Sequence, residues 1–442
     1  MIANHNINIP GMCSGGKVER DLSDEKSHQF RIRHTRFRLL KIPKMQTYWS
    51  LFFFIIFVSM LTILSGCATV IRTPLPADQS SGARIPGMTD IRYWGDTLSP
   101  EIDELLALQI SQAEAYSPQA FRRTSYNLAI SGGGANGAFG AGLLVGWSEA
   151  GDRPTFAIVT GISTGALIAP FAFLGSKYDE QLRQVYTTTA TKDILKLRSL
   201  VTFLSSDAAA DSKPLQDIIR RYITQDILEN IAVEYAKGRR LVVGTTNLDA
   251  KRPVLWDITA IAASGRKEAL RLVRNVILAS ASIPGVFPPV YIKVEANGQQ
   301  YDEMHVDGGM AFQVFLYPPQ LDHKRLSKII KRDFDAHIYV IRNAHLNPEW
   351  QTVPPKVSRI ATASISTLIL NQGMGNLELL YFLAMRDGYD FNLAYIPSEF
   401  KEEPTEQFDS EYMKKLFDVG YDLARTGNPW QKMPPRLKVP EP

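Results

Sequence analysis

The stretch LAISGGGANGAFGAG, Leu128 to Gly142, is the first segment of this sequence that indicates both a fold and a chemistry. Its apolar start, just after Tyr126, is typical of a short buried strand, and its small residues are typical of a following helix. Between them, Gly132, Gly134 and Gly137 have the spacing G-x-G-x-x-G. A glycine loop between strand and helix presents N–H groups to an anion, which is either a bound phosphate or a transient oxyanion.

The segments around this loop alternate between patterns typical of strands and of helices. Strands are expected at 126–130, 156–161, 239–248 and 336–344, and helices at 101–116, 136–151, 164–175, 213–224 and 267–281. Beyond Pro355, helical patterns cover 358–388 and 410–427. This alternation predicts an α/β fold with a mainly parallel sheet and helices on both faces.

A dinucleotide site at the glycine loop requires a further residue. The next strand should end in an acid about 20 residues on, to bind the ribose hydroxyl. That strand ends at Gly161 without one, and Glu149 and Asp152 come too early. No G-K-[ST] follows the loop, so a nucleotide triphosphate loop is not supported either. The oxyanion is the better interpretation.

A second motif, GISTG, follows the next expected strand and has the form G-x-S-x-G. Its residues are Gly161, Ile162, Ser163, Thr164 and Gly165. A serine at a tight strand-to-helix turn exposes its hydroxyl, and flanking glycines remove side chains that would clash there.

Two kinds of partner for Ser163 remain open from the residues alone. The usual base is a histidine oriented by an acid. The other candidate is Asp307 in VDGG, on a turn that presents one carboxylate. The histidines that follow the leader are His305, His323, His337 and His345.

Three segments in this order, GGGANG, GISTG and DGG, resemble the signatures of the patatin-like phospholipases, and Ala279 to Val290 resembles the family's segment before its aspartate motif. The resemblance covers about Asn127 to Gln320 and implies a patatin-like three-layer α/β/α fold with extra C-terminal helices. It assigns Ser163 as nucleophile and Asp307 as proton acceptor. It places the oxyanion hole and the aspartate motif at Gly132, Gly133, Gly134, Ala135, Asn136 and Gly137, and at Asp307, Gly308 and Gly309.

Two loop residues depart from the family pattern, which often has Asp at the start and Arg before the last glycine. Here Ser131 and Asn136 stand at these positions. The backbone N–H groups remain, so an oxyanion hole is still expected, while the missing positive charge leaves substrate preference and rate open. Asn136 is expected either to donate an amide hydrogen bond or to satisfy the loop backbone.

The resemblance implies a lipid acyl hydrolase of the phospholipase A or lysophospholipase type, which cleaves carboxylic esters through an acyl-enzyme. No metal or other cofactor is implied, and Asp302, Glu303 and His305 are expected in a solvated loop. Two alternatives stay open: a Ser–His–acid esterase or thioesterase, and a lipoprotein that binds lipids without turnover.

The N-terminal region predicts a lipoprotein leader. A basic stretch precedes the apolar segment Leu51 to Leu64, and LSGC, ending at Cys67, resembles a bacterial lipobox. Cleavage there makes Cys67 the lipidated N-terminus, and the following Ala68, which is not Asp, favours the outer membrane, facing the periplasm, over the inner membrane. The alternative is an uncleaved anchor, because residues 49–71 carry no charge. Translation from Met45 is also open.

The excess positive charge of the chain, +4 in total, lies in this leader. Nine basic and four acidic residues precede Cys67, and 40 basic and 41 acidic residues remain. No nucleic-acid partner is expected. The expected partners are a phospholipid or lysophospholipid and the membrane, through Cys67. The expected organisation is a leader and signal peptide (1–66), a tether (67–100), the patatin-like domain (127–320) and a C-terminal strand and helical extension packed on it (321–442).

Overall fold

A computed structural model of the chain describes residues 49–50, 52–57, 72–117, 124–198, 207–331, 333–348 and 350–438. The chain divides into two units, Met1–Ser65 and Gly66–Pro442. In the first unit, residues 52–57 are helical and exposed. Cys67 lies outside the described residues, so its lipidation stays a prediction. No helix within the described ranges has the length and apolar character to cross a membrane.

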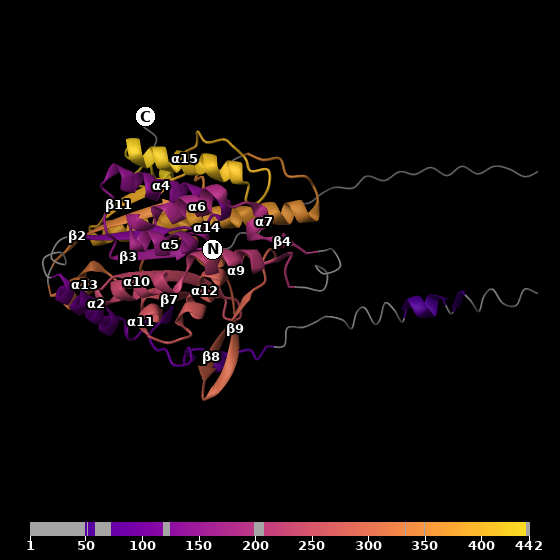
Figure 1. Cartoon of the computed structure of the whole chain (residues 1–442), viewed down its shortest axis with the longest axis horizontal. Coiled ribbons are helices and arrows are strands. Elements are labelled where there is room, and N and C mark those ends of the chain that lie inside the picture. The colour runs from indigo at the N-terminus through magenta and orange to yellow at the C-terminus, as the bar shows by residue number, and fades with distance from the viewer. Residues whose placement is uncertain are drawn as a thin grey trace, which may run out of the picture. The chain divides into compact units, whose positions relative to one another are not determined.

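A nine-stranded sheet forms the centre of the second unit (Figure 1). Its order is β1-β7-β6-β3-β2-β10-β11, with β9 paired to β6 and β8 to β9. The run from β6 to β11 is parallel, and the other pairings are antiparallel. The strands are β1 (Arg92–Trp94), β2 (Thr124–Ile130), β3 (Ile158–Ile162), β6 (Arg240–Asn247), β7 (Arg252–Asp257), β8 (Val290–Ala296), β9 (Gln299–Asp307), β10 (Asp335–Arg342) and β11 (Asp390–Tyr395).

Helices cover both faces of this sheet. Alternate residues of β2 show the two faces, because Leu128 and Ile130 belong to one buried cluster and Ala129 to another. The mixed α/β fold with a mainly parallel sheet is therefore confirmed. The helices are α2 (Ile102–Tyr116), α4 (Gly137–Ala150), α5 (Thr164–Leu174), α6 (Asp179–Thr188), α7 (Thr191–Ile194), α9 (Lys213–Tyr222), α10 (Gln225–Ala236), α11 (Ile258–Ala263), α12 (Ala269–Ser280), α13 (His323–Ile330), α14 (Val357–Asp387) and α15 (Ser410–Thr426).

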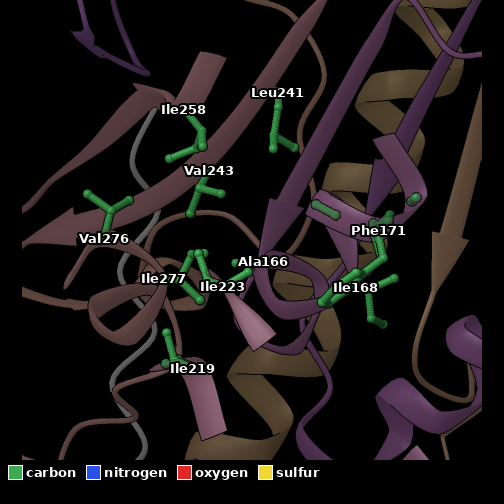
Figure 2. Close-up of a cluster of buried hydrophobic side chains, with 14 of the residues drawn as sticks. Ala166, Ile168, Phe171, Ile219, Ile223, Leu241, Val243, Ile258, Val276 and Ile277 are labelled. Carbon is green, nitrogen blue, oxygen red and sulfur yellow. The ribbon is translucent and has the colours of Figure 1, made fainter. Parts of the chain in front are cut away.

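The larger cluster fixes α5 against the sheet, which matters because α5 begins directly after Ser163. Figure 2 shows Ala166 of α5 beside side chains from β6 and α12. Val243 of β6 and Ile277 of α12 are completely buried there. Burying an aliphatic side chain of this size contributes about 1.5–3 kcal/mol, so the turn that carries Ser163 rests on a rigid base.

Residues 72–100, which the sequence suggests are part of a tether, contact the body of the second unit. β1 pairs with β7, and Ile85, Met88 and Ile91 are buried. Arg72 forms a two-pronged ion pair with Asp249. The proline- and glycine-rich composition of this segment is typical of a tether, and its few apolar residues form no regular pattern. These apolar residues are nevertheless the ones that pack against the body of the second unit.

Candidate active site

The candidate site lies where several strands end. The glycine loop follows β2, Ser163 follows β3, and Asp307 ends β9. β2 and β3 are neighbouring parallel strands, and the end of β9 pairs with β6, the next strand in the sheet. The carboxyl ends of parallel strands open onto one edge of a sheet, so the topology brings the three motifs together.

Ser163 occupies a strained backbone conformation, with φ 54° and ψ −123°. Such a conformation costs about 1–3 kcal/mol and persists where the surroundings enforce it. The flanking glycines allow it, because a Cβ on Gly161 would lie 2.4 Å from the Gly165 carbonyl oxygen. The Ser163 N–H donates to Ser280 Oγ at 3.0 Å, and Ser280 Oγ donates to the Gly244 carbonyl at 2.7 Å. Ser280 thereby ties the serine turn to β6.

Asp307 is the partner of the Ser163 hydroxyl. Ser163 Oγ donates to Asp307 Oδ2 at 2.7 Å, and the Gly309 N–H donates to Oδ1 at 2.7 Å. Both side chains are buried. Burial raises the pKa of Asp307 to about 6, although the hydrogen bonds from Ser163 and Gly309 lower it. Among the described residues no basic side chain forms an ion pair with Asp307, so no cation offsets the burial of its carboxylate.

The glycine loop leaves three consecutive backbone donors open. The Gly132 N–H donates to the Gln313 carbonyl at 3.2 Å, and the Asn136 N–H to the Gly133 carbonyl at 3.1 Å. Within the described part of the chain, the N–H groups of Gly133, Gly134 and Ala135 have no acceptor. Gly134 has φ +57° and lines a cavity beside Ser163. The N–H groups of Gly133 and Gly134, with Ala135 next to them, are therefore the candidate oxyanion donors, and the N–H of Gly132 is already used.

Ser131, where the family often has an acid, holds the loop in place. Its Oγ accepts from the Asn343 N–H at 2.9 Å and donates to the Gly132 carbonyl at 2.7 Å. The Asn343 amide donates to the Ser131 carbonyl at 2.9 Å and accepts from the Gly140 N–H at 3.1 Å. Asn343 directly follows β10, so a strand outside the three motifs anchors the loop.

Asn136, where the family often has Arg, carries no charge, and its carbonyl oxygen is engaged by α15. Its Oδ1 accepts a hydrogen bond from the Tyr412 hydroxyl of α15 at 2.7 Å. The side chain therefore joins the loop to α15, a contact that neither expectation for Asn136 included. The physical reason is that α15 packs along α4, the helix that begins at Gly137.

An apolar cavity of about 50 Å³ opens beside Ser163. Its wall favours a hydrocarbon chain over a polar group, because aliphatic and aromatic side chains dominate it. A neighbouring polar hollow of about 450 Å³ shares Thr189 and Ile218 with it. The apolar side chains are Leu167, Val185, Ile194, Leu215, Ile218, Ala281, Ile283, Phe287, Phe408 and Met413.

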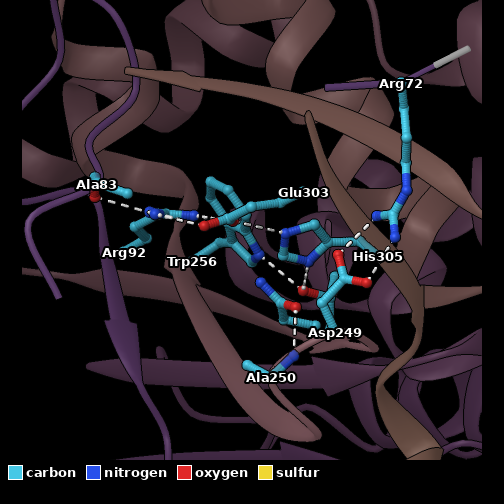
Figure 3. Close-up of polar contacts among 10 residues, drawn as sticks. Arg72, Ala83, Arg92, Asp249, Ala250, Trp256, Glu303 and His305 are labelled. Atoms are coloured by element: carbon cyan, nitrogen blue, oxygen red, sulfur yellow. Dashed lines mark hydrogen bonds and ion pairs between the residues drawn. The ribbon is translucent and has the colours of Figure 1, made fainter. Parts of the chain in front are cut away.

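Glu303 and His305 do not lie in a solvated loop; that expectation is wrong. Both are buried on β9, where His305 Nε2 contacts Glu303 Oε2 at 3.1 Å and His305 Nδ1 contacts Thr245 Oγ1 at 2.9 Å (Figure 3). Arg92 of β1 forms an ion pair with Glu303. The cation from β1 compensates the buried carboxylate, which makes burial of this polar strand possible.

Three histidines hydrogen-bond to acids and not to Ser163. His305 is held by Glu303, His323 contacts Asp333 and His337 contacts Asp390. Burial also lowers the pKa of His305. No group of three or more His, Cys, Asp or Glu side chains with metal-binding geometry occurs in the described ranges.

Three residues that support the site were not identified from the sequence. Ser280 lies inside the segment Ala279 to Val290, and nothing in that part of the sequence indicated a contact with Ser163. Gln313 lies in the loop after the aspartate turn and Asn343 directly follows β10, and neither stands in a motif. Gln313 accepts from Gly132 through its carbonyl and donates from Nε2 to the Gly309 carbonyl at 2.7 Å. It thus joins the glycine loop to the aspartate turn.

No curated protein matches this chain. One solved structure that does match is VipD from Legionella pneumophila, at 13% identity, with 69% of this chain and 67% of that chain covered and a TM-score of 0.30. This likeness is too distant to carry an argument. Residues 128–317, which contain the glycine loop, the serine turn and the aspartate turn, match the family model described as patatin-like phospholipase.

Proposed function

We propose that the chain is a lipid acyl hydrolase that cleaves carboxylic esters of phospholipids or lysophospholipids through Ser163 and Asp307. The observation that carries the proposal is the 2.7 Å hydrogen bond from Ser163 Oγ to an Asp307 carboxylate without a cationic partner among the described residues. The family match over 128–317 supports the hydrolase class. The apolar cavity beside Ser163 supports an acyl chain as the bound group.

In the acylation step, Ser163 Oγ attacks the ester carbonyl carbon while Asp307 accepts the hydroxyl proton. The carbonyl oxygen becomes an oxyanion, which the N–H groups of Gly133 and Gly134 stabilise. The C–O bond to the leaving alcohol then breaks, and the proton on Asp307 passes to that alcohol. The product is an acyl ester on Ser163.

Hydrolysis of this acyl-enzyme repeats the sequence with water. Asp307 accepts a proton from the water as its oxygen attacks the acyl carbon, and the proton returns to Ser163 Oγ as the fatty acid leaves. The pKa of about 6 suits both roles, because Asp307 must accept and release a proton near neutral pH. No metal takes part in these steps.

Mass spectrometry of phospholipids after incubation with the full chain tests this proposal. Wild type should release free fatty acid, and Ser163→Ala and Asp307→Asn should each lose about 10²–10⁴-fold of the rate. His345→Ala is the matched control for the Ser–His alternative and should keep its rate. Full activity of Ser163→Ala would refute the dyad. Loss of activity in His345→Ala together with full activity in Asp307→Asn would also refute it. Lipid binding without turnover by wild type would favour the non-catalytic alternative.

We also propose that Cys67 carries the lipid and tethers the chain to the outer membrane on its periplasmic side. The support is the LSGC sequence after an apolar segment. Metabolic labelling with a fatty acid should modify wild type and spare Cys67→Ser. A labelled Cys67→Ser protein would contradict this part.

A further inference from the structure

The outer half of α14, residues 357–369, exposes large aliphatic side chains. Val357 is 87% exposed, Leu368 70%, and Ile360 and Ile365 52% each. The buried residues of α14 begin only at Gly373. Single exposed hydrophobic residues are ordinary on a protein surface, but a cluster on one protruding helix marks an interaction site.

The residues of α14 that directly follow this outer half contact the loops of the candidate active site. Gln372 Nε2 donates to the Ala311 carbonyl at 2.8 Å, and Gln313 Nε2 donates to Gln372 Oε1 at 3.1 Å. Gln313 also donates from its backbone to Asn376 Oδ1 at 2.8 Å. α14 therefore leaves the body at the loop that follows Asp307, where Met310 is itself 44% exposed.

The charges around the outer half have a single sign. From residue 351 to residue 377 the only charged residues are Lys356 and Arg359. Neither has an ion-pair partner among the described residues. An apolar surface with cations and without acids fits an anionic lipid surface.

A second segment at the cavity also exposes an apolar side chain and lysines, although the acids Asp193 and Asp211 lie beside them. α7 and the strand β4 (Lys196–Leu197) follow Thr189, which lines the cavity, and Leu197 is 73% exposed. Lys192 and Lys196 are exposed and form no ion pair within the described ranges, while the nearby Asp193 accepts from the Ala190 N–H. In Figure 1 the outer end of α14, α7 and β4 lie toward the same end of the second unit.

The exposure of the outer half distinguishes a lipid from a protein partner. Every residue from Val357 to Ile369 except Ala363 is exposed, so no single stripe is set apart for a protein groove. Lipid tails can surround a helix on all sides. The Thr367 hydroxyl is already satisfied by the Ala363 carbonyl at 2.8 Å, which lowers the cost of placing it in an apolar medium.

We propose that the outer half of α14, together with α7 and β4, docks on an anionic lipid bilayer and holds the mouth of the cavity against it. Docking itself requires no catalysis. Only the role we give to docking, the delivery of substrate to the cavity, rests on the proposed function. Leu368, Ile365 and Val357 enter the interface, and Lys356, Arg359, Lys192 and Lys196 contact lipid phosphates. Docking would pass an acyl chain into the cavity without exposing it to water.

Fluorescence tests the docking without reference to catalysis. The full chain with Cys13→Ser and Cys67→Ser carries a nitrobenzoxadiazole label on Leu368→Cys, and the matched control carries it on Val233→Cys. Val233 of α10 is another exposed aliphatic residue, at 55%. Vesicles of phosphatidylglycerol and phosphatidylcholine in equal parts should shift the emission at 368 to the blue and leave 233 unchanged. Pure phosphatidylcholine vesicles should give a weaker shift.

Activity supplies the second readout. Ile365→Ser with Leu368→Ser should lose at least about tenfold of the hydrolysis of vesicle phospholipid, and Val233→Ser should lose none. Both should hydrolyse a soluble short-chain ester at the wild-type rate, because that substrate needs no interface.

An emission at 368 that changes with neither vesicle type would overturn the proposal. An emission that is already blue before vesicles are added, in a protein with the mass of a dimer, would also overturn it, because a second copy would then cover the helix. Equal responses to the two vesicle types would overturn its charge component. A shift at 368 without hydrolysis of any ester would leave docking intact and refute the proposed function instead, so the two failures are distinguishable.

Discussion

Glu303 and Asp307 are two buried carboxylic acids on the same strand, β9, and their surroundings drive their pKa values in opposite directions. Burial alone would raise the pKa of Glu303, but the hydrogen bond from His305 and the charge of Arg92 lower it to about 2. Burial raises the pKa of Asp307 to about 6, and its hydrogen bonds from Ser163 and Gly309 only partly oppose this. The Arg92 cation keeps Glu303 ionised. Asp307 has no ion-pair partner among the described residues and takes up a proton more readily.

The comparison shows how one strand can carry both a carboxylate in an ion pair and a carboxylate without a cation. The Arg92 guanidinium comes from β1, while the donors to Asp307 among the described residues are a serine hydroxyl and a backbone N–H. Under the proposed function, the carboxylate without a cation is the one that acts as a base. The predictions below change one of these two carboxylates, its partner, or a contact that positions the serine turn or the glycine loop.

Asp307→Asn has the largest expected effect on activity. The amide keeps the shape but cannot accept the Ser163 proton, so ester hydrolysis should fall by about 10²–10⁴-fold. Glu303→Gln, the matched change on the same strand, should keep most of the rate. Steady-state kinetics on a soluble ester measure both, and equal losses in the two variants would mean that the distinction between them is wrong.

Arg92→Met should have the largest effect on stability. It leaves the Glu303 carboxylate buried without its cation, at a cost of about 3–5 kcal/mol in the free energy of unfolding. Adding Glu303→Gln should recover much of that loss. Urea unfolding measures both, and an unchanged midpoint for Arg92→Met would contradict a compensating role for Arg92.

Asp307→Asn should also stabilise the protein at high pH. The folded-state pKa is raised, so the folded state binds more protons than the unfolded state between about pH 4 and pH 6, and stability contributed by Asp307 falls as pH rises through that window. Above pH 6 the ionised group costs about 3 kcal/mol, which the amide removes. Urea unfolding should show this gain at pH 8 and none near pH 3.

Glu303 should give the opposite pH dependence. Its folded-state pKa is lowered to about 2, so its contribution is complete above pH 4.5 and is lost as pH falls toward 2. Wild type should therefore lose more stability than Glu303→Gln between pH 4.5 and pH 2. Parallel unfolding curves for the two proteins over that range would show that Glu303 is not held ionised.

Ser280→Ala and Asn136→Ala have the smallest expected effects, and that of Asn136→Ala is the smaller of the two. Ser280→Ala removes the acceptor for the Ser163 N–H and should cost about 1–3 kcal/mol of stability, with a smaller loss of activity than Asp307→Asn. Asn136→Ala, which removes only the contact with Tyr412, should cost about 1 kcal/mol and leave the rate on a soluble ester unchanged. A large loss of activity in Asn136→Ala would show that this side chain reaches the substrate.

The parallel strands were predictable because local patterns encode them, whereas Asp307 was assigned as the partner of Ser163 only by the resemblance to the patatin-like family. Apolar runs followed by glycines mark β2 and β3, and the GISTG and DGG turns bring Ser163 and Asp307 within hydrogen-bond distance. The antiparallel strands were not predictable in the same way. The sequence of β9 is polar, which is typical of a solvated segment. Its burial depends on an ion pair between Glu303 and Arg92, which lies 211 residues earlier in the chain.

The supporting residues were hidden for the same reason. Asn343 and Gln313 hold the glycine loop through contacts that span much of the chain, and neither stands in a motif. The segment 72–100 looked like a tether because its few apolar residues are interrupted by proline and glycine. Long-range contacts, not local patterns, decide these parts.

The labelling rate of Ser163 by a fluorophosphonate as a function of pH tests the central claim most directly. If Asp307 is the base, wild-type labelling should rise with a midpoint near the pKa of about 6, and Glu303→Gln should keep this midpoint. Asp307→Asn should label slowly at every pH. A wild-type rate without a midpoint in this range, or rapid labelling of Asp307→Asn, would contradict the account.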